Sequence, residues 1–121
     1  MSHSPFSGVT IVDFSRVLAG PYATAMFADL GAEVIKIEIP GVGDDARHLG
    51  PFKDGESVYF SGLNRGKKSV EIDLKSDEDR ARLDTLLDRA DVVVENFRPG
   101  VAHKLGISAE QLRAKRPELV Y

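Results

Sequence analysis

The hydrophobic pattern of residues 9–38 predicts a strand, a helix and a second strand. Apolar runs at residues 9–14 and 34–39 form the two predicted strands. Between them, Pro21 suits the first turn of a helix, and Gly31 suits the position just beyond its end. Two strands joined by one helix form a right-handed crossover, so we expect these strands to be parallel.

The predicted helix carries no charged residue between Val17 and Ala28. A helix that is apolar all round is usually buried, so we expect it to be covered on both sides. It is too short to span a bilayer, which takes about 20 residues. Its start, Leu18–Pro21, follows the first strand, where open parallel sheets bind ligands and free N–H groups favour anions. The alternative is a tight turn that packs well but binds no ligand. The absence of the dinucleotide-binding glycine pattern keeps this alternative open.

The rest of the chain alternates further strands and helices. We expect disorder over residues 1–7, a long structureless loop over residues 40–57 and a basic turn over residues 64–68. The turn precedes the third strand, which places it at the sheet edge opposite the ligand side unless the long loop folds back. The remaining elements are a strand at 69–74, a helix at 76–90 with Ser76 as its N-cap, a central buried strand at 91–97, a helical turn at 99–105, a helix at 109–115 capped by Ser108 and Gln111, and the opening of a fifth strand at 119–121.

These elements predict an α/β fold: a Rossmann-like open parallel sheet with flanking helices. The 121 residues suffice for one domain at most, covering residues 8–121. Since Leu119, Val120 and Tyr121 open a strand just as the sequence stops, we expect the fold to be incomplete, as the N-terminal part of something longer.

Composition excludes several functions. The formal net charge of −3 argues against general nucleic-acid affinity, and the absence of cysteine removes disulfides and thiolate catalysis. The first residues contain no apolar leader, so we expect a cytoplasmic protein without a membrane partner.

Candidate chemistry gathers near the ends of strands, but no catalytic set emerges. The three histidines, His3, His48 and His103, lie far apart without metal-ligand spacing, and His48 is expected to be a solvated loop residue. Asp13 lacks the adjacent acid of a phospho-acceptor receiver domain. Asn96 and Phe97 lie where the central strand ends. They could hold a heterocycle through an amide and a ring, or they could be an ordinary strand end with a core aromatic residue. Basic side chains suit phosphates or are simply solvated; they are Arg65, Lys67, Lys68, Arg98 and Lys104.

Taken together, these segments resemble the family III CoA-transferases (the CaiB–BaiF family). The resemblance runs in order from about Gly8 to Tyr121. It is carried by DFSRVLAGPYATAMFADLGAEVIKIE, PGVGDDAR, YF…NRGKKSVEIDLK, ADVVVENFRPG, LG and PELVY.

The resemblance implies a coenzyme A site, with CoA or an acyl-CoA as substrate and no prosthetic group or metal. In the family, the position of Ile72 touches the adenine region, and a basic residue at the position of Lys104 reaches a phosphate. Ile39 replaces a further basic contact of some members, so that contact is either lost or supplied elsewhere, with Lys36 and Arg47 as the candidates. Leu18 replaces a polar residue beside the acyl group. The residues expected to bind CoA are Val17, Leu18, Ala19, Ile72, Asn96, Phe97, Arg98 and Lys104.

The resemblance also implies the chemistry. An aspartate is acylated by the donor acyl-CoA, which releases CoA. The mixed anhydride is attacked by this CoA to give an aspartyl-CoA thioester and the free donor acid, and the acceptor acid then takes the CoA. That aspartate lies beyond the position of Tyr121, so no catalytic residue is expected here and the chain alone is expected to be inactive. Members form interlocked homodimers. Residues 40–47 resemble members that exchange CoA between dicarboxylic acids such as succinate. The alternatives are the 2-methylacyl-CoA racemase branch and a non-catalytic nucleotide-binding module.

Overall fold

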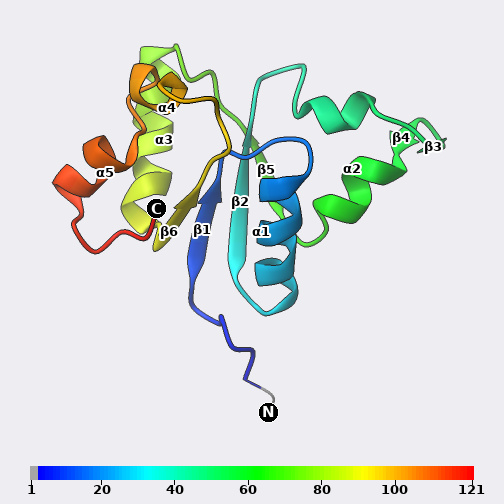
Figure 1. Cartoon of the computed structure of the whole chain (residues 1–121), viewed down its shortest axis with the longest axis horizontal. Helices are drawn as coiled ribbons and strands as arrows, with labels where there is room; N and C mark the ends of the chain where they lie inside the picture. Colours follow the sequence, from blue (N-terminus) through cyan, green and yellow to red (C-terminus); the bar gives the residue numbers. More distant parts are fainter. Residues whose placement is uncertain (1–2) are drawn as a thin grey trace.

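Four parallel strands form the centre of the computed structural model, which describes residues 3–121 (Figure 1). The order across the sheet is β5-β2-β1-β6. Val12 in β1 lies opposite Ile35 in β2 and Val93 in β6. The predicted open parallel sheet with flanking helices is therefore confirmed. The strands are β1 (Thr10–Asp13), β2 (Glu33–Glu38), β5 (Lys68–Glu71) and β6 (Val92–Val94).

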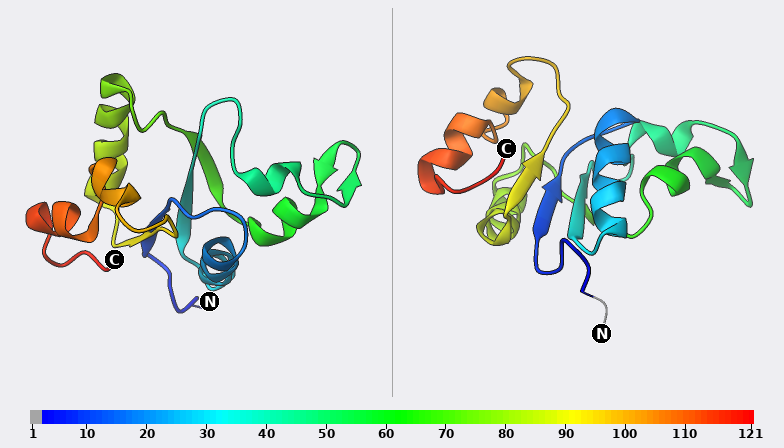
Figure 2. Two further views of the ribbon diagram at one scale, coloured as in Figure 1. Left: turned by 45° about the horizontal axis from the view of Figure 1, so that its top comes forward. Right: turned by 60° about the horizontal axis from the view of Figure 1, so that its bottom comes forward.

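The helices lie on both faces of this sheet (Figure 2). Ser76 accepts a hydrogen bond from the N–H of Asp79, and Ser108 and Gln111 form the predicted capping box. The helices are α1 (Ala19–Asp29), α2 (Val58–Leu63), α3 (Asp77–Arg89), α4 (Val101–Lys104) and α5 (Ala109–Lys115).

The alternation of side chains along the strands divides the core between the two faces. Val12 and Ile35 belong to a cluster with residues of α3, including Leu83. Ile11 and Val34 point to the opposite face, where Phe27 and other residues of α1 cover them. Because both faces are covered, every residue of β2 after Glu33 is buried, including the charged residues Lys36 and Glu38.

The prediction of a structureless loop over residues 40–57 is wrong. This stretch contains a 3-10 turn, η1 (Asp45–His48), and a hairpin of β3 (Phe52–Lys53) and β4 (Glu56–Ser57). The buried hydroxyl of Ser57 donates to the carbonyl of Ala46, which ties the hairpin to the turn. His48 is solvent-exposed, as expected.

Two further expectations need correction. Helix α1 is not covered on both sides within this chain, because Tyr22 and Met26 remain 54% and 44% exposed. The segment before β1 is ordered from Ser4 onward: the ring of Phe6 packs edge-on against Phe27, at 4.9 Å between centroids. This partly buried aromatic pair packs the segment against α1. Residues 1–2 of the expected lead-in lie outside the described residues.

The predicted fifth strand is present only as a single parallel bridge. Val120 pairs with Val92, and the N–H of Val93 donates to the carbonyl of Val120 at 2.9 Å. Strand β6 thus has partners on both sides, and Val93 is 1% exposed. The prediction of a central strand buried on both faces is only partly confirmed, because β6 lies at the edge of the four-stranded sheet, Val92 and Val94 are partly exposed, and the regular strand is shorter than predicted.

Candidate functional site

The loop between β1 and α1 has an unusual backbone conformation. Val17 has a φ of 70°, in the left-handed region that β-branched residues rarely adopt. Such a conformation costs on the order of 1–3 kcal/mol and persists only where the surroundings enforce it. The surroundings here are side chains from two distant segments. The N–H of Val17 donates to Oδ1 of Asp44 at 3.0 Å. The side chain of Asn96 accepts from the N–H of Arg16 and donates to its carbonyl.

The start of α1 is packed tightly against the end of β1. A Cβ atom on Gly20 would collide with the side chain of Ser15. The close approach of the two segments therefore requires glycine at this position of the Ala-Gly-Pro turn. The N-cap residue Leu18 contributes no side-chain hydrogen bond, and the side chains of Val17 and Leu18 are exposed.

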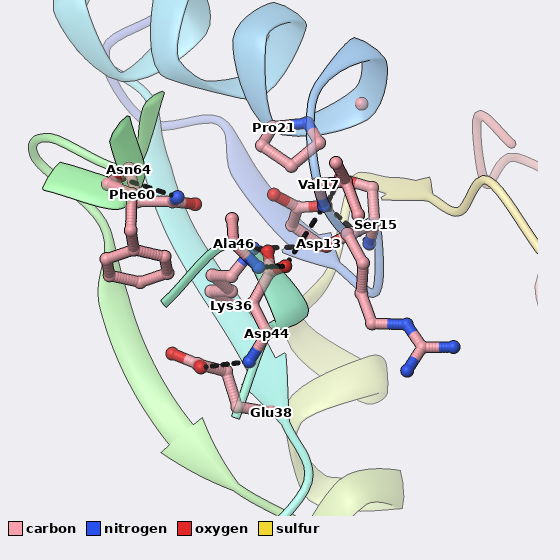
Figure 3. A network of polar contacts seen from close by, with 12 residues as sticks. Asp13, Ser15, Val17, Pro21, Lys36, Glu38, Asp44, Ala46, Phe60 and Asn64 are labelled. Carbon is pink, nitrogen blue, oxygen red and sulfur yellow. Dashed lines mark hydrogen bonds and ion pairs between the residues drawn. The ribbon is translucent and has the colours of Figure 1, made fainter. Parts of the chain in front are cut away.

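A buried ion pair holds Asp44 in place (Figure 3). Its Oδ2 lies 2.7 Å from Nζ of Lys36, and its Oδ1 accepts from the N–H groups of Val17 and Ala46. Lys36 also donates to the carbonyl of Ser15 at 3.1 Å. Each member of the pair is 1% exposed, so each charge depends on these contacts.

Glu38 extends this network toward Arg47. Its carboxylate accepts from the N–H of Asp44 at 2.8 Å, from Ser69 at 2.7 Å, and from two nitrogens of Arg47 at 2.7 and 2.6 Å. Burial by itself raises the pKa of Glu38, but the hydrogen bonds from Arg47, Ser69 and Asp44 outweigh it and hold the pKa at about 2. The Arg47 guanidinium also lies over the ring of Phe60, 3.9 Å from its centroid.

A second buried ion pair lies at the carboxyl end of β1. Nζ of Lys67 is 3.2 Å from Oδ2 of Asp13, which also accepts from Thr24 at 2.6 Å. Burial lowers the pKa of Lys67, and the neighbouring Lys36 lowers it further against the opposing effect of Asp13. The expectation that the basic turn lies at the opposite edge is wrong for Lys67. Strand β5 is staggered along β2, with Lys68 opposite Ile35, so its start lies near the end of β1.

A groove of about 300 Å³ opens beside this network. The guanidinium of Arg16 lies 5.7 Å from the ring centroid of Phe97 at its edge. Ile72, which follows β5 and is 1% exposed, contributes to the apolar wall, as do Val101 and Leu105 of α4. The groove thus offers apolar surfaces, one stacked cation and an aromatic ring, a combination suited to a heterocycle with attached anionic groups.

The structure brings some of the predicted site residues together and leaves others apart. Ile72 and Phe97 line the groove, and Asn96 holds the backbone of Arg16, whose side chain lines it. Exposed residues beyond the groove wall complete the predicted set; they are Val17, Leu18, Ala19, Arg98 and Lys104.

Two residues proposed as substitutes for the missing basic contact at Ile39 are already engaged. Lys36 is buried with Asp44, and Arg47 is held by Glu38 through two nitrogens. In this conformation the Lys36 ammonium is buried, and the Arg47 guanidinium is paired with Glu38. Ile39 itself lines the groove and adds to its apolar wall.

The sequence reading missed Arg16 and Asp44. The signal for Asp44 was present in β2, where Lys36 shares a face with Val34 in a strand that a parallel fold must bury on both sides. A lysine in that position requires a carboxylate partner, and residues 44–45 are the first acids after the end of β2.

Neither a metal site nor a membrane span emerges from the part of the chain that the structure describes. Within residues 3–121, no three histidine, aspartate or glutamate side chains come together in a metal-binding cluster. Among the described helices, none combines the length and apolarity that crossing a bilayer requires.

Comparison with known proteins identifies the family. Residues 6–121 match the model of CoA-transferase family III. The chain belongs to this family. Its fold also matches the crystal structure of a CAIB/BAIF family protein from Brucella suis, with a TM-score of 0.91 and 41% identity over 99% of this chain and 33% of that one. The resemblance noted from the sequence motifs is thereby confirmed.

Its relatives include named CoA-transferases. The chain is 48% identical to acetyl-CoA:oxalate CoA-transferase of Acetobacter aceti, over 97% of this chain and 30% of that protein. It is also 48% identical to succinyl-CoA:mesaconate CoA-transferase of Haloarcula hispanica, over 92% of this chain and 29% of that protein. The chain therefore spans about 30% of the length of the curated relatives that it matches.

Proposed function

We propose that the groove beside Arg16 binds the CoA part of an acyl-CoA and that this family III chain is the CoA-binding part of an acyl-CoA:carboxylate CoA-transferase. The observation that carries the proposal is the fixed loop at the carboxyl end of β1. Asp44 and Asn96 hold its backbone beside a groove lined by Ile72 and Phe97. Ligands of open parallel sheets bind at this edge.

The surfaces of the groove suit the parts of CoA. Ile72 and Phe97 offer apolar contact for the adenine ring, and Arg16 adds a cation beside it. Arg98 and Lys104 are exposed cations near the ends of β6 and α4, and they suit the phosphates. Val17, Leu18 and Ala19 then border the pantetheine and thioester. In this proposal CoA is a substrate, and the chain holds no prosthetic group.

The reaction needs a carboxylate that is free to attack a thioester, and the buried carboxylates around the loop do not supply one. Asp13, Glu38 and Asp44 are all buried, and each accepts hydrogen bonds at both oxygens. A nucleophile occupied in this way is not available. We therefore do not assign nucleophilic catalysis to any of these three residues.

We infer that the second substrate is a dicarboxylic acid. Named relatives act on oxalate and on mesaconate with succinyl-CoA, and a further relative from Agrobacterium fabrum, 45% identical over 97% of this chain, is named succinate–glutarate CoA-transferase. We also expect the native protein to be a homodimer. Exposed apolar side chains on and around α1 support an interface there; they are Leu18, Tyr22, Met26 and Leu30.

Isotope exchange tests this function. The native protein is incubated with succinyl-CoA and carbon-13-labelled succinate, oxalate, mesaconate or glutarate, and acyl-CoA products are followed by mass spectrometry. The proposal expects label to enter the CoA thioester with at least one dicarboxylate. Deuterium uptake at the α-carbon of a 2-methylacyl-CoA in heavy water, without label exchange, would instead identify a racemase. CoA binding without either reaction would indicate a nucleotide-binding module.

A further inference from the structure

We propose that Asp44 is a positioning residue for CoA binding: it holds the N–H of Val17 and thereby fixes the left-handed turn beside the groove. Asp44 touches no ligand in this role and acts through the loop backbone. The inference rests on the proposed CoA site and adds a residue that lies 27 positions from Val17 in the chain.

The geometry singles out Asp44 among the contacts to the loop. Asn96 holds the N–H and carbonyl of Arg16, but the N–H of Val17 donates to Asp44, at 3.0 Å. The same oxygen, Oδ1, accepts from Ala46 at 2.9 Å, which fixes the carboxylate relative to its own turn. Asp44 is 1% exposed, so water does not compete for these hydrogen bonds.

The position requires two acceptor oxygens. Oδ1 serves the N–H groups of Val17 and Ala46, while Oδ2 pairs with Nζ of Lys36. An asparagine keeps the size of the side chain but has one acceptor oxygen, and its amide nitrogen donates. Asp44→Asn must therefore weaken the contact to Val17, the contact to Lys36, or both.

The backbone of Val17 explains why this contact affects the loop. A φ of 70° is unfavourable for valine and is as accessible as negative values for glycine. When the hydrogen bond to Asp44 is weakened, the free energy of the loop falls if Val17 leaves the left-handed region, and the loop shifts with it. Glycine at the same position has no such preference. The dependence of the loop on Asp44 is thus tied to the residue type at position 17.

A double-mutant cycle in the native protein tests this link. CoA affinity is measured by calorimetry for the wild type, Asp44→Asn, Val17→Gly and the double variant. We expect Asp44→Asn to weaken CoA binding about tenfold or more when residue 17 is valine, and about threefold or less when it is glycine. The melting temperature should fall in both backgrounds, because Lys36 loses part of its partner in each.

The outcomes separate this inference from the proposed function. If the wild type does not bind CoA, the proposed function fails. If the wild type binds CoA and Asp44→Asn changes the affinity by the same factor in both backgrounds, or by none, Asp44 is only a partner of Lys36 and the positioning role is wrong.

A second variant keeps the inference open to refutation if Asp44→Asn fails to fold. Val17→Pro leaves the Asp44–Lys36 pair intact but removes the N–H and fixes φ near −65°. We expect a folded protein whose CoA affinity is about tenfold or more below that of Val17→Gly, which also lacks the valine side chain but keeps the N–H. A Val17→Pro protein that binds CoA like the wild type would refute the role of Asp44.

Discussion

The side-chain amide of Asn96 makes two hydrogen bonds to the backbone of Arg16. Its Oδ1 accepts from the N–H of Arg16 at 2.9 Å, and its Nδ2 donates to the carbonyl at 2.8 Å. The two residues are 80 positions apart and follow the adjacent parallel strands β6 and β1. A single amide thus joins the carboxyl ends of two strands at the edge where the groove opens.

Asn96→Ala should therefore weaken CoA binding. The variant removes both hydrogen bonds to Arg16 and frees the segment that carries the guanidinium over Phe97. We expect the dissociation constant to rise about tenfold, which corresponds to about 1.4 kcal/mol. Thr85→Ala serves as control, since its hydroxyl donates only within α3, to Ala81. An unchanged affinity of the Asn96 variant in a calorimetric titration would remove Asn96 from the site.

Lys104 is expected to contribute through charge. It is exposed on α4 and forms no ion pair within residues 3–121. Lys104→Ala should weaken CoA binding by about threefold to tenfold at low ionic strength and by less at high salt, because exposed charges are screened. Lys115→Ala, an exposed lysine on α5, should leave the affinity unchanged at either salt concentration. A Lys104 variant whose affinity loss does not depend on salt would contradict a phosphate contact.

Substitution by alanine is expected to have opposite effects on stability at Gly20 and at Gly62. A methyl group on Gly20 meets the Ser15 side chain, whereas nothing lies within 4 Å of the corresponding position on Gly62 in α2. Gly20→Ala should lower the free energy of unfolding by about 1–3 kcal/mol. Gly62→Ala should raise it by up to about 1 kcal/mol, because alanine is a better helix former. Equal effects of the two substitutions in chemical denaturation would refute the close contact at Gly20.

Glu38 should make the protein acid-sensitive. Its pKa is about 2 in the folded protein against 4.5 as the ordinary value, so the folded state favours the charged form. This contribution to the free energy of unfolding is present above about pH 4.5 and is lost as the pH falls toward 2. Glu38→Gln should lower stability at neutral pH and flatten its decline below pH 5. The exposed Glu118 provides a control, since Glu118→Gln should retain most of that decline. A Glu38 variant with the wild-type pH profile would contradict this ionisation.

The sequence predicted the sheet well because its signals are local. Apolar runs, Ser76 and the Ser108–Gln111 capping box each act within a few residues. The four predicted strands before residue 100 and the predicted helices are present, and only the fifth strand is reduced to a single bridge. The segment at residues 40–57 was predicted poorly, because its turn and hairpin are held by contacts such as Ser57 to Ala46 rather than by periodicity.

The candidate site was predictable only in part. The positions of Ile72 and Phe97 followed from motifs, and both line the groove. The roles of Asp44 and Lys67 depend on the stagger of β5 along β2 and on the return of the loop after β2, which no spacing in the sequence expresses. From the sequence alone, charged residues such as these are expected to lie on the solvated surface. Their burial becomes evident only once both faces of the sheet are known to be covered.

The most direct test of the central claim is a titration of the nitrogen-15-labelled protein with CoA, followed by amide chemical shifts. We predict saturable shifts at Val17, Leu18, Ala19, Ile72, Asn96 and Phe97, with the amides of α5 unaffected. Shifts confined to α3 and α5, or no saturable shifts at all, would contradict the assignment of CoA to the groove beside Arg16.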